Sequence, residues 1–330
     1  MLAVTLLAAS VAAKAALPTV WSITELGTAA GEPQAISDNG IIAGCLVANG
    51  RNRAFTWSNG SLRELPSGPS VDSDSCAYAV NNAGMAAGSV DGQAVVWRNG
   101  AMLGLAVRGV ATGINESGVV VGRIQLGEGS SAPTHAFQWK DGVLTDLHPA
   151  GAGTSRAVAI NESGQIAGTV DSRAVIWQNG TLRELGFTPI SVTAINDRGE
   201  VIGLNVFGDA PKAAPYMFNG TLARIPGGAG GDLSALAITN GGRVLVNGVD
   251  GYTTVVENGE RLSFEYMPSM RGQGWKRLEP RAMNEPGWIV GYGLHDSASR
   301  MFLIMPDTSA NPLAREAARG RRLISSRRAP

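Results

Sequence analysis

Side chains with the chemistry to transform a ligand are few in this sequence. Among 330 residues there are only three histidines, His135, His148 and His295. No His-Glu-x-x-His, Cys-x-x-Cys, calcium-loop or Gly-x-Ser-x-Gly pattern is present. The sequence therefore predicts no metal or cofactor, and we assign no catalytic residue from it.

Cationic and aromatic side chains in the connecting segments are the better candidates for binding. Together they would suit an acidic glycan or an acidic peptide, with Asp72 and Asp74 close by in the chain. The alternative is that these side chains only keep the loops in solvent. The predicted ligand-binding residues are Arg51, Arg53, Arg123, His135, Lys212, Trp275, His295 and Arg300.

A short sequence motif recurs along the chain and predicts the elements that would carry these residues. Residues 54–66 read AFTWSNGSLRELP, and altered copies follow at 94–106, 136–148, 174–186, 215–226 and 253–265. Each copy has two apolar runs around Asn-Gly or Asp-Gly, the strongest short signal for a β-hairpin. With Asn59-Gly60 as the turn, Trp57 pairs with Leu62. Because side chains alternate along a strand, Phe55 and Trp57 share one face and Ala54 takes the other.

A second sequence motif precedes each copy of the first, and its seven occurrences define seven repeats. It is a short strand of small residues, a turn that is Asn-x-x-Gly in most copies, and an apolar run. A repeat therefore contains four short strands, and the repeats are spaced 34 to 46 residues apart. The second motif of repeats one to seven lies at 35–44, 79–88, 113–122, 159–168, 194–203, 237–246 and 282–291.

Four strands in each of seven units predict an all-β fold, a seven-bladed β-propeller. The seventh repeat has three strands but lacks its Asn-Gly and its fourth strand. The segment WSITELG at 21–27 resembles the fourth strands of the other repeats, yet no first three strands precede it. We therefore expect the N-terminal strand to close the last blade. An open solenoid is the alternative, but it would have no use for complementary fragments at its two ends.

The composition agrees with many buried strands joined by tight turns, and the two cysteines bear on the compartment. The chain has 44 glycines, and only 16% of its residues are charged. Trp57, Trp97, Trp139 and Trp177 share one register of the third strand, which we interpret as core. Cys45 and Cys76 would be able to pair if adjacent blades bring them together in an oxidising compartment. The sequence leaves both pairing and free thiols open.

The two ends of the chain predict a compartment. Residues 1–15 resemble a secretory signal peptide, with an apolar run too short to span a bilayer and a small-residue cleavage pattern at Ala13-Lys14-Ala15. Residues 16–306 would form a single propeller domain, and 307–330 a disordered basic tail. We expect a secreted, periplasmic or cell-surface protein without a transmembrane segment in its mature chain. The formal net charge is zero, and no nucleic-acid partner is expected.

Two segments resemble a known family of repeats. GINESGVVVG at 113–122, followed by THAFQWKDGVLTDL at 134–147, is similar to the extracellular HAF repeat of bacterial exported proteins, which is named after His-Ala-Phe. Here those residues are His135, Ala136 and Phe137. Only repeat three keeps all three, and repeats five to seven lose the tryptophan. The resemblance covers residues 20–306; it implies export and provides no catalytic residues.

These observations together predict an exported, non-catalytic binding propeller. Its partner would be a glycan, a peptide or an envelope protein, held by variable loops on one rim, where binding sites are commonly built on a rigid frame. Two alternatives remain at this point. One is a polysaccharide-acting hydrolase or lyase whose paired carboxylates converge from distant blades. The other is a structural component of the cell envelope.

Overall fold

The computed structural model describes residues 20–68, 70, 72–129, 131–207, 213–225, 234–247 and 253–307. The expected leader at 1–15, the cation Lys212 and the basic tail after Asp307 lie outside the described residues. Within them the fold is all-β, as predicted, and its one helical element is a single 3-10 turn, η1 (Phe264–Tyr266).

The strands follow one another in short steps along the repeats. Repeats one to three contain β2 (Gly31–Ile36), β3 (Ile42–Ala48), β4 (Arg51–Ser58), β5 (Ser61–Glu64), β6 (Ser75–Val80), β7 (Ala86–Val90), β8 (Gln93–Arg98), β9 (Ala101–Ile114), β10 (Val120–Gln125), β11 (Thr134–Lys140) and β12 (Val143–Asp146). Repeats four to six contain β13 (Ser155–Ile160), β14 (Ile166–Val170), β15 (Arg173–Gln178), β16 (Thr181–Glu184), β17 (Ser191–Ile195), β18 (Val201–Val206), β19 (Ala213–Phe218), β20 (Leu222–Arg224), β21 (Ser234–Ile238), β22 (Val244–Asn247), β23 (Thr253–Glu257) and β24 (Glu260–Ser263). Repeat seven contains β25 (Trp275–Met283), β26 (Ile289–His295) and β27 (Ala298–Pro306), and β1 (Trp21–Glu25) comes first in the chain.

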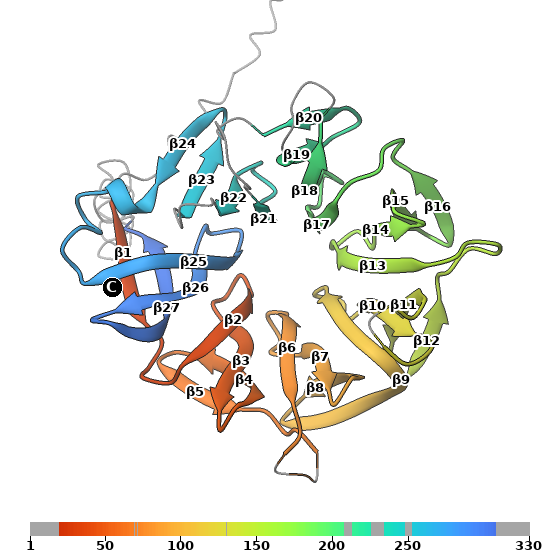
Figure 1. The fold of residues 1–330 in the computed structure, drawn as a ribbon, viewed down its shortest axis with the longest axis horizontal. Coiled ribbons are helices and arrows are strands. Elements are labelled where there is room, and N and C mark those ends of the chain that lie inside the picture. The colour runs from red at the N-terminus through yellow and green to blue at the C-terminus, as the bar shows by residue number, and fades with distance from the viewer. Residues whose placement is uncertain are drawn as a thin grey trace, which may run out of the picture.

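These strands form antiparallel sheets that stand side by side around a common centre, in a β-propeller arrangement (Figure 1). Five of the sheets have four strands each, and one has seven. The seven-stranded sheet spans repeats two and three, because the long strand β9 pairs with β8 through its first half and with β10 through its second. The first strand of each repeat lies nearest the centre.

The first strand of the chain lies beside the last one. β1 pairs antiparallel with β27 along its whole length, from Trp21 opposite Pro306 to Glu25 opposite Phe302. It is thus the outer strand of the sheet β25–β26–β27–β1. Beyond it, the Leu26 amide donates to the Met301 carbonyl at 3.0 Å.

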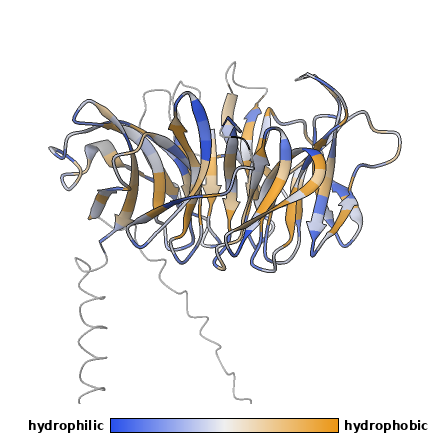
Figure 2. Ribbon diagram, turned by 90° about the horizontal axis from the view of Figure 1, so that it is seen from below, coloured by the Kyte–Doolittle hydropathy of each residue, from blue (hydrophilic) through white to orange (hydrophobic). Residues whose placement is uncertain are grey.

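The side-chain faces predicted for the hairpin of repeat one are confirmed. Trp57 lies opposite Leu62 in the β4–β5 pair. Asn59 and Gly60 have φ of 49° and 81°, the positive values that the turn requires. Phe55 and Trp57 pack toward repeat seven, in a cluster with Val290. Ala54 packs on the other side, toward repeat two. Apolar residues therefore occupy both faces of the sheet, and the edge-on view shows them concentrated on the strands (Figure 2).

A glycine in the second strand of six repeats is required by close approach of the backbone. A Cβ added at Gly88, Gly122 or Gly168 would lie 2.0 or 2.1 Å from a carbonyl oxygen of the first strand. The first strand bulges at this level in every repeat, which brings its carbonyl inward. In repeats one, three, four, five and seven an aromatic ring of the third strand lies over the glycine, as Phe137 does over Gly122.

The connections expected to be variable loops in repeats one and seven are mostly extended hairpins, so that prediction was wrong. Strands β3 and β4 run to a two-residue turn at Asn49 and Gly50, both with positive φ. Strands β26 and β27 do the same at Asp296 and Ser297. The physical reason is the turn chemistry, since Asn-Gly and Asp-Ser accept left-handed conformations that keep two strands in register.

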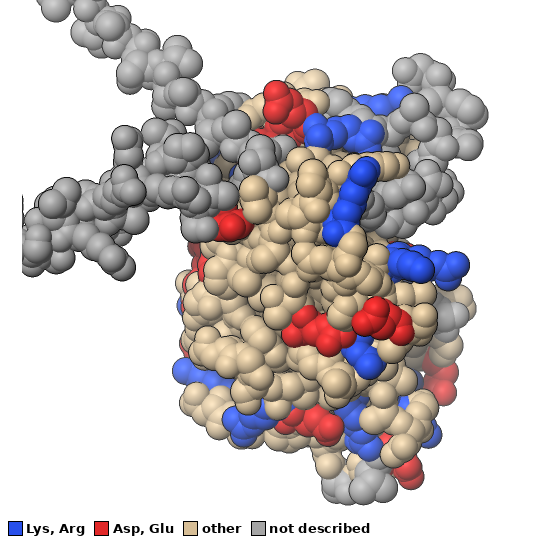
Figure 3. All heavy atoms as spheres, turned by 90° about the vertical axis from the view of Figure 1, so that its left-hand side faces the viewer, with Lys and Arg blue, Asp and Glu red and all other residues tan. Residues whose placement is uncertain are grey.

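The first strand of the chain is covered by the connection that follows repeat six. Trp21 is 1% exposed, and its ring contacts that of Phe264 edge to face, with centroids 4.8 Å apart. Met267 and Met270, which follow η1, belong to the same core cluster. Seen from this side of the molecule, the surface carries scattered charged side chains of both signs among uncharged ones (Figure 3).

Candidate functional site

Two rims of the ring differ in their chemistry. The turns between first and second strands, and between third and fourth strands, share one rim, called here the turn rim. The connections between second and third strands, and from one repeat to the next, share the opposite rim, called here the loop rim.

At the turn rim a hydrogen bond links each Asn-x-x-Gly-type turn to the next. A backbone amide of one turn donates to a side-chain oxygen of the following turn, at N···O distances of 2.7 to 3.1 Å. The last link runs from the Glu285 amide back to Asp38 in repeat one, so the links form a closed circle. The accepting side chains are Asp38, Asn82, Glu116, Glu162, Asp197, Asn240 and Glu285.

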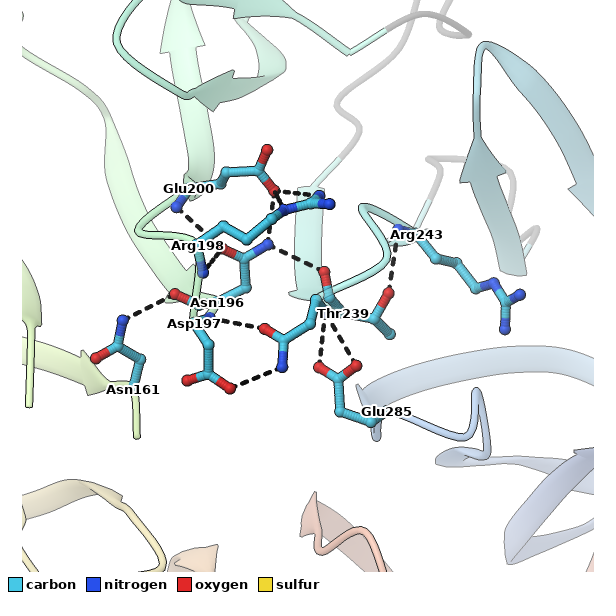
Figure 4. Close-up of polar contacts among 9 residues, drawn as sticks. Asn161, Asn196, Asp197, Arg198, Glu200, Thr239, Arg243 and Glu285 are labelled. Carbon is cyan, nitrogen blue, oxygen red and sulfur yellow. Dashed lines mark hydrogen bonds and ion pairs between the residues drawn. The ribbon is translucent and has the colours of Figure 1, made fainter. Parts of the chain in front are cut away.

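A second set of links lies beside the first and uses buried asparagines (Figure 4). The Asn161 amide group donates to the Asn196 carbonyl at 2.9 Å, and that of Asn196 donates to the Thr239 carbonyl at 3.0 Å. The side-chain oxygen of Asn161 accepts the Gln165 amide of its own turn, as is typical of an asparagine that opens a turn. Each buried asparagine thus stabilises its own turn and bonds to its neighbour.

The carboxylates of this circle lie close enough to affect one another. Burial is the largest cause that raises the pKa of the Glu162 carboxyl, and the charges of Glu116 and Asp197 raise it further. Burial also raises the pKa of Glu285, with Asp38 and Asp197 adding to it. The carboxylate acceptors of this circle are already occupied by backbone amides. Among the described residues, no group of three or more His, Cys, Asp or Glu side chains has a metal-binding arrangement.

At the loop rim, the predicted residues of repeat seven come together. Trp275 is the first residue of β25, not part of a loop, and its ring stacks on that of His295 with centroids 4.6 Å apart. His295 Nδ1 lies 2.8 Å from Glu25 Oε1, and Arg300 Nε lies 3.3 Å from the same oxygen. Their common partner Glu25 belongs to β1. This group, called here the closure cluster, joins the two ends of the described chain.

The hydrogen bond to Glu25 raises the pKa of His295, and the Asp296 charge adds to it, although partial burial acts against both. The protonated imidazole is therefore favoured in the folded protein. Sequence reasoning missed Glu25 because nothing in WSITELG distinguishes its carboxylate from other surface charges.

The predicted histidine of repeat three is part of another compact group. His135 and His148 stack with centroids 3.7 Å apart, and His135 Nδ1 lies 2.8 Å from Asp146 Oδ2. His148 Nε2 lies 3.0 Å from the Ala152 carbonyl, an arrangement that requires a proton on that nitrogen. His148 Nδ1, 2.8 Å from Ser155 Oγ, then accepts the serine hydroxyl.

This contact resembles a catalytic serine–histidine pair, but the fold gives it another explanation. Ser155 is fully buried, and its Oγ accepts the Ala136 amide of repeat three at 2.8 Å. Ser75 makes the same contact with the Ala54 amide at 2.9 Å, without a histidine nearby in the hydrogen-bond network. The serine is therefore a repeated link between neighbouring repeats.

The remaining predicted residues lie in repeats one and three. Arg53, in β4, donates to Ser67 Oγ and to the Ser73 carbonyl and so holds the connection to repeat two. Asp74 accepts the Asn52 amide at 2.7 Å in the same region. Arg51 is exposed at the start of β4, and Asp72 is exposed in the connection. The structure does not bring these residues together with the closure cluster.

Cys45 and Cys76 form a disulfide between repeats one and two, with their Cα atoms 4.8 Å apart. Arg123, in β10, is half-buried and belongs to none of the groups above. A hollow of about 430 Å³ lies at the turn rim between repeats four and five, lined by Gln165, Arg183, Arg198 and Phe218 among others.

Comparison with known proteins supports the fold and gives no family. No protein-family model matches the chain, and no curated protein matches it. Solved structures do match. The extracellular domain of a one-component system, BT4673, from B. thetaiotaomicron has a TM-score of 0.51 at 12% identity; the match covers 86% of this chain and 39% of that one. This chain thus spans about two-fifths of the length of that structure.

Two further structures match at lower scores. One is YCF48 bound to D1 peptide, with a TM-score of 0.49, 12% identity and coverage of 86% of this chain and 95% of that one. The other is the acylaminoacyl peptidase of Pyrococcus horikoshii, with a TM-score of 0.48, 11% identity and coverage of 82% and 52%. No helix among the described residues is both long and apolar enough to cross a bilayer.

Proposed function

We propose that this chain is a binding propeller of seven blades, closed by β1, that holds a partner at its loop rim. The count follows from treating the seven-stranded sheet as two blades that share β9. The pairing of β1 with β27 supplies the fourth strand of the last blade. Such a ring leaves only the short outer strands of its sheets as edges.

The observation that carries the proposal is the difference between the two rims. At the turn rim, backbone amides and side-chain acceptors bond to one another in a closed circle. At the loop rim, the exposed Arg51 has no ion-pair partner among the described residues. A rigid frame whose turn rim is occupied by its own hydrogen bonds suits binding at the opposite rim, the loop rim.

The repeat resemblance and the leader-like sequence extend the proposal to a compartment. We assign the chain to exported proteins of the HAF-repeat type, placed in the periplasm, at the cell surface or outside the cell. The Cys45–Cys76 disulfide supports this assignment because disulfides persist in oxidising compartments.

An array of glycans and peptides probed with the full chain tests the function. We expect retention of a ligand that is weakened by Arg51→Ala or His135→Ala on the loop rim. Arg183→Ala, at the turn rim, is the matched control and should bind as the wild type does. A ligand whose binding is lost only in the Arg183 variant would place the site on the wrong face and refute the proposal.

A further inference from the structure

A hollow of about 350 Å³ opens at the loop rim beside repeat two. It lies between the connection that follows repeat one, the turn between β7 and β8, and the first half of β9. Val95 and Met102, which line it, are buried and half-buried, whereas the lining residues Asp91 and Gln93 are exposed. The hollow is therefore apolar in its depth and polar at its opening. Among the described residues that line it, Asp91 alone carries a charge.

The hollow lies where repeat two lacks a side chain that the other repeats have. The fourth-strand residue opposite Val95 is Gly104. A Cβ added at Gly104 would have no atom within 4 Å apart from its own chain neighbours, so the space beside it is open. In the other repeats the same position holds Glu25, Glu64, Asp146, Glu184, Arg224 and Ser263.

In three of the other repeats this position takes part in an ion pair. The partner is the cation that stands two residues before the opposing residue of the third strand. The N···O distances are 2.8 Å for His135–Asp146, 3.0 Å for Arg173–Glu184 and 3.3 Å for Arg300–Glu25. In repeat two, Gln93 and Gly104 stand in these two places, so both the cation and the acid are missing.

Asp91 offers one carboxylate oxygen to the hollow. Its Oδ1 accepts the Asp74 amide at 2.8 Å, and its own amide donates to the Asp74 carbonyl at 2.8 Å. Its Oδ2 makes no hydrogen bond or ion pair with any described residue. A guanidinium prefers to engage both oxygens of a carboxylate, whereas an ammonium is satisfied by one. The connection on the other side is fixed in advance, because Arg53 donates to Ser67 Oγ at 3.1 Å.

We propose that this hollow binds the side chain of a lysine that a peptide partner presents to the loop rim. The inference rests on the proposed function and narrows the partner to a peptide. The aliphatic stem of the lysine packs against Val95 and Met102, as the stems of such side chains do on apolar surfaces. The ammonium donates to Asp91 and has further acceptors in Ser67 and Gln93 at the opening.

Methyl NMR of the full chain with isotope-labelled methionine tests the proposal, because Met102 lines the hollow. The probes are Nα-acetyl-lysine methylamide and its norleucine counterpart, which keeps the four-carbon stem and lacks the ammonium. We expect the lysine probe to shift the Met102 signal to saturation. The norleucine probe should bind about tenfold more weakly or worse, as expected for loss of a charge-assisted hydrogen bond.

Two variants locate the binding. Gly104→Leu fills the hollow and should abolish the shift, and it should melt no lower than the wild type because the backbone there is not left-handed and the space is open. Asp91→Asn keeps an acceptor for the Asp74 amide and should weaken the lysine probe to the level of norleucine. Asp171→Asn changes the same turn in repeat four, where Arg173 pairs with Glu184, and is the matched control that should bind as the wild type does.

Three results would overturn the inference: no shift of Met102 with the lysine probe, equal binding of the two probes, or unchanged binding in Gly104→Leu. A partner found on the array that is lost in Arg51→Ala but retained in Gly104→Leu would also overturn it, while supporting the proposed function. A partner lost only in the Arg183 variant refutes the proposed function instead. The two failures are therefore distinguishable.

Discussion

Replacing Trp21 by alanine should destabilise the whole ring, because this side chain fastens the first strand of the chain to the last repeat. The ring is 1% exposed and packs edge to face on Phe264. Truncating a buried tryptophan costs about 3–5 kcal/mol, which includes the cavity left behind. For a domain of about 290 residues, with an unfolding entropy of roughly 0.6 kcal/mol/K, that corresponds to a fall in melting temperature of roughly 5–8 °C. Strand β1 pairs with β27 on one side only, so it has no second strand to hold it.

Urea unfolding followed by circular dichroism measures the effect, with Ser22→Ala as the matched control. Ser22 is exposed on the same strand, so its variant should unfold as the wild type does. Deletion of residues 16–30 should exceed the Trp21 effect, because it also removes the β1 ladder and the buried Leu26. A Trp21→Ala protein within about 1 kcal/mol of the wild type would refute the reasoning.

Three further predictions concern other parts of the ring. The contact with Glu25 raises the pKa of His295 above 6.5. The stability that the protonated imidazole contributes is therefore complete below pH 6.5 and is lost as the pH rises through the raised pKa. The melting temperature should fall over this pH window, and His295→Gln should make that fall smaller. Tyr216→Phe should leave the free energy of unfolding unchanged or raise it by about 1 kcal/mol, because the buried hydroxyl has no hydrogen-bond partner among the described residues; a loss of stability in urea unfolding would argue against this. Asn161→Ala should cost about 1–3 kcal/mol by leaving the Asn196 carbonyl and a turn amide without their donor and acceptor, whereas Asn161→Thr, which keeps a cap of the kind seen in repeat six, should cost less in the same assay.

The all-β architecture was predictable because local turn chemistry recurs. Asn-Gly and Asp-Gly form two-residue hairpin turns at most of their described occurrences, and the alternation around them fixes the faces, as at Trp57 and Ala54. Turn signals of the same kind at Asn49-Gly50 and at Asp296-Ser297 were not recognised from the sequence. These turns extend the flanking strands and place Arg51 and His295 in or beside hairpins. Long connections in sequence were read as loops although they contained turn signals of their own.

The closed circle of the turn rim was not predicted, although its signal is present. The residue after the turn-opening residue is Asp, Asn or Glu in every repeat, from Asp38 to Glu285. Its partner lies in the next repeat, at a separation of tens of residues, so that no local rule reveals the contact. The closure cluster is hidden for the same reason, since it depends on which strands of different repeats become neighbours.

A disulfide placed across the β1–β27 pair tests the central claim most directly. In the chain described here Ser22 lies opposite Met305, and cross-strand neighbours of this kind come close to the separation that a disulfide needs. The double variant Ser22→Cys with Met305→Cys, oxidised and mapped by mass spectrometry, should carry a cross-link between these two positions in addition to the Cys45–Cys76 bond. It should also unfold at higher urea concentration than its reduced form with Cys45–Cys76 intact. Free thiols at both positions in the folded, oxidised protein would contradict the meeting of the two ends.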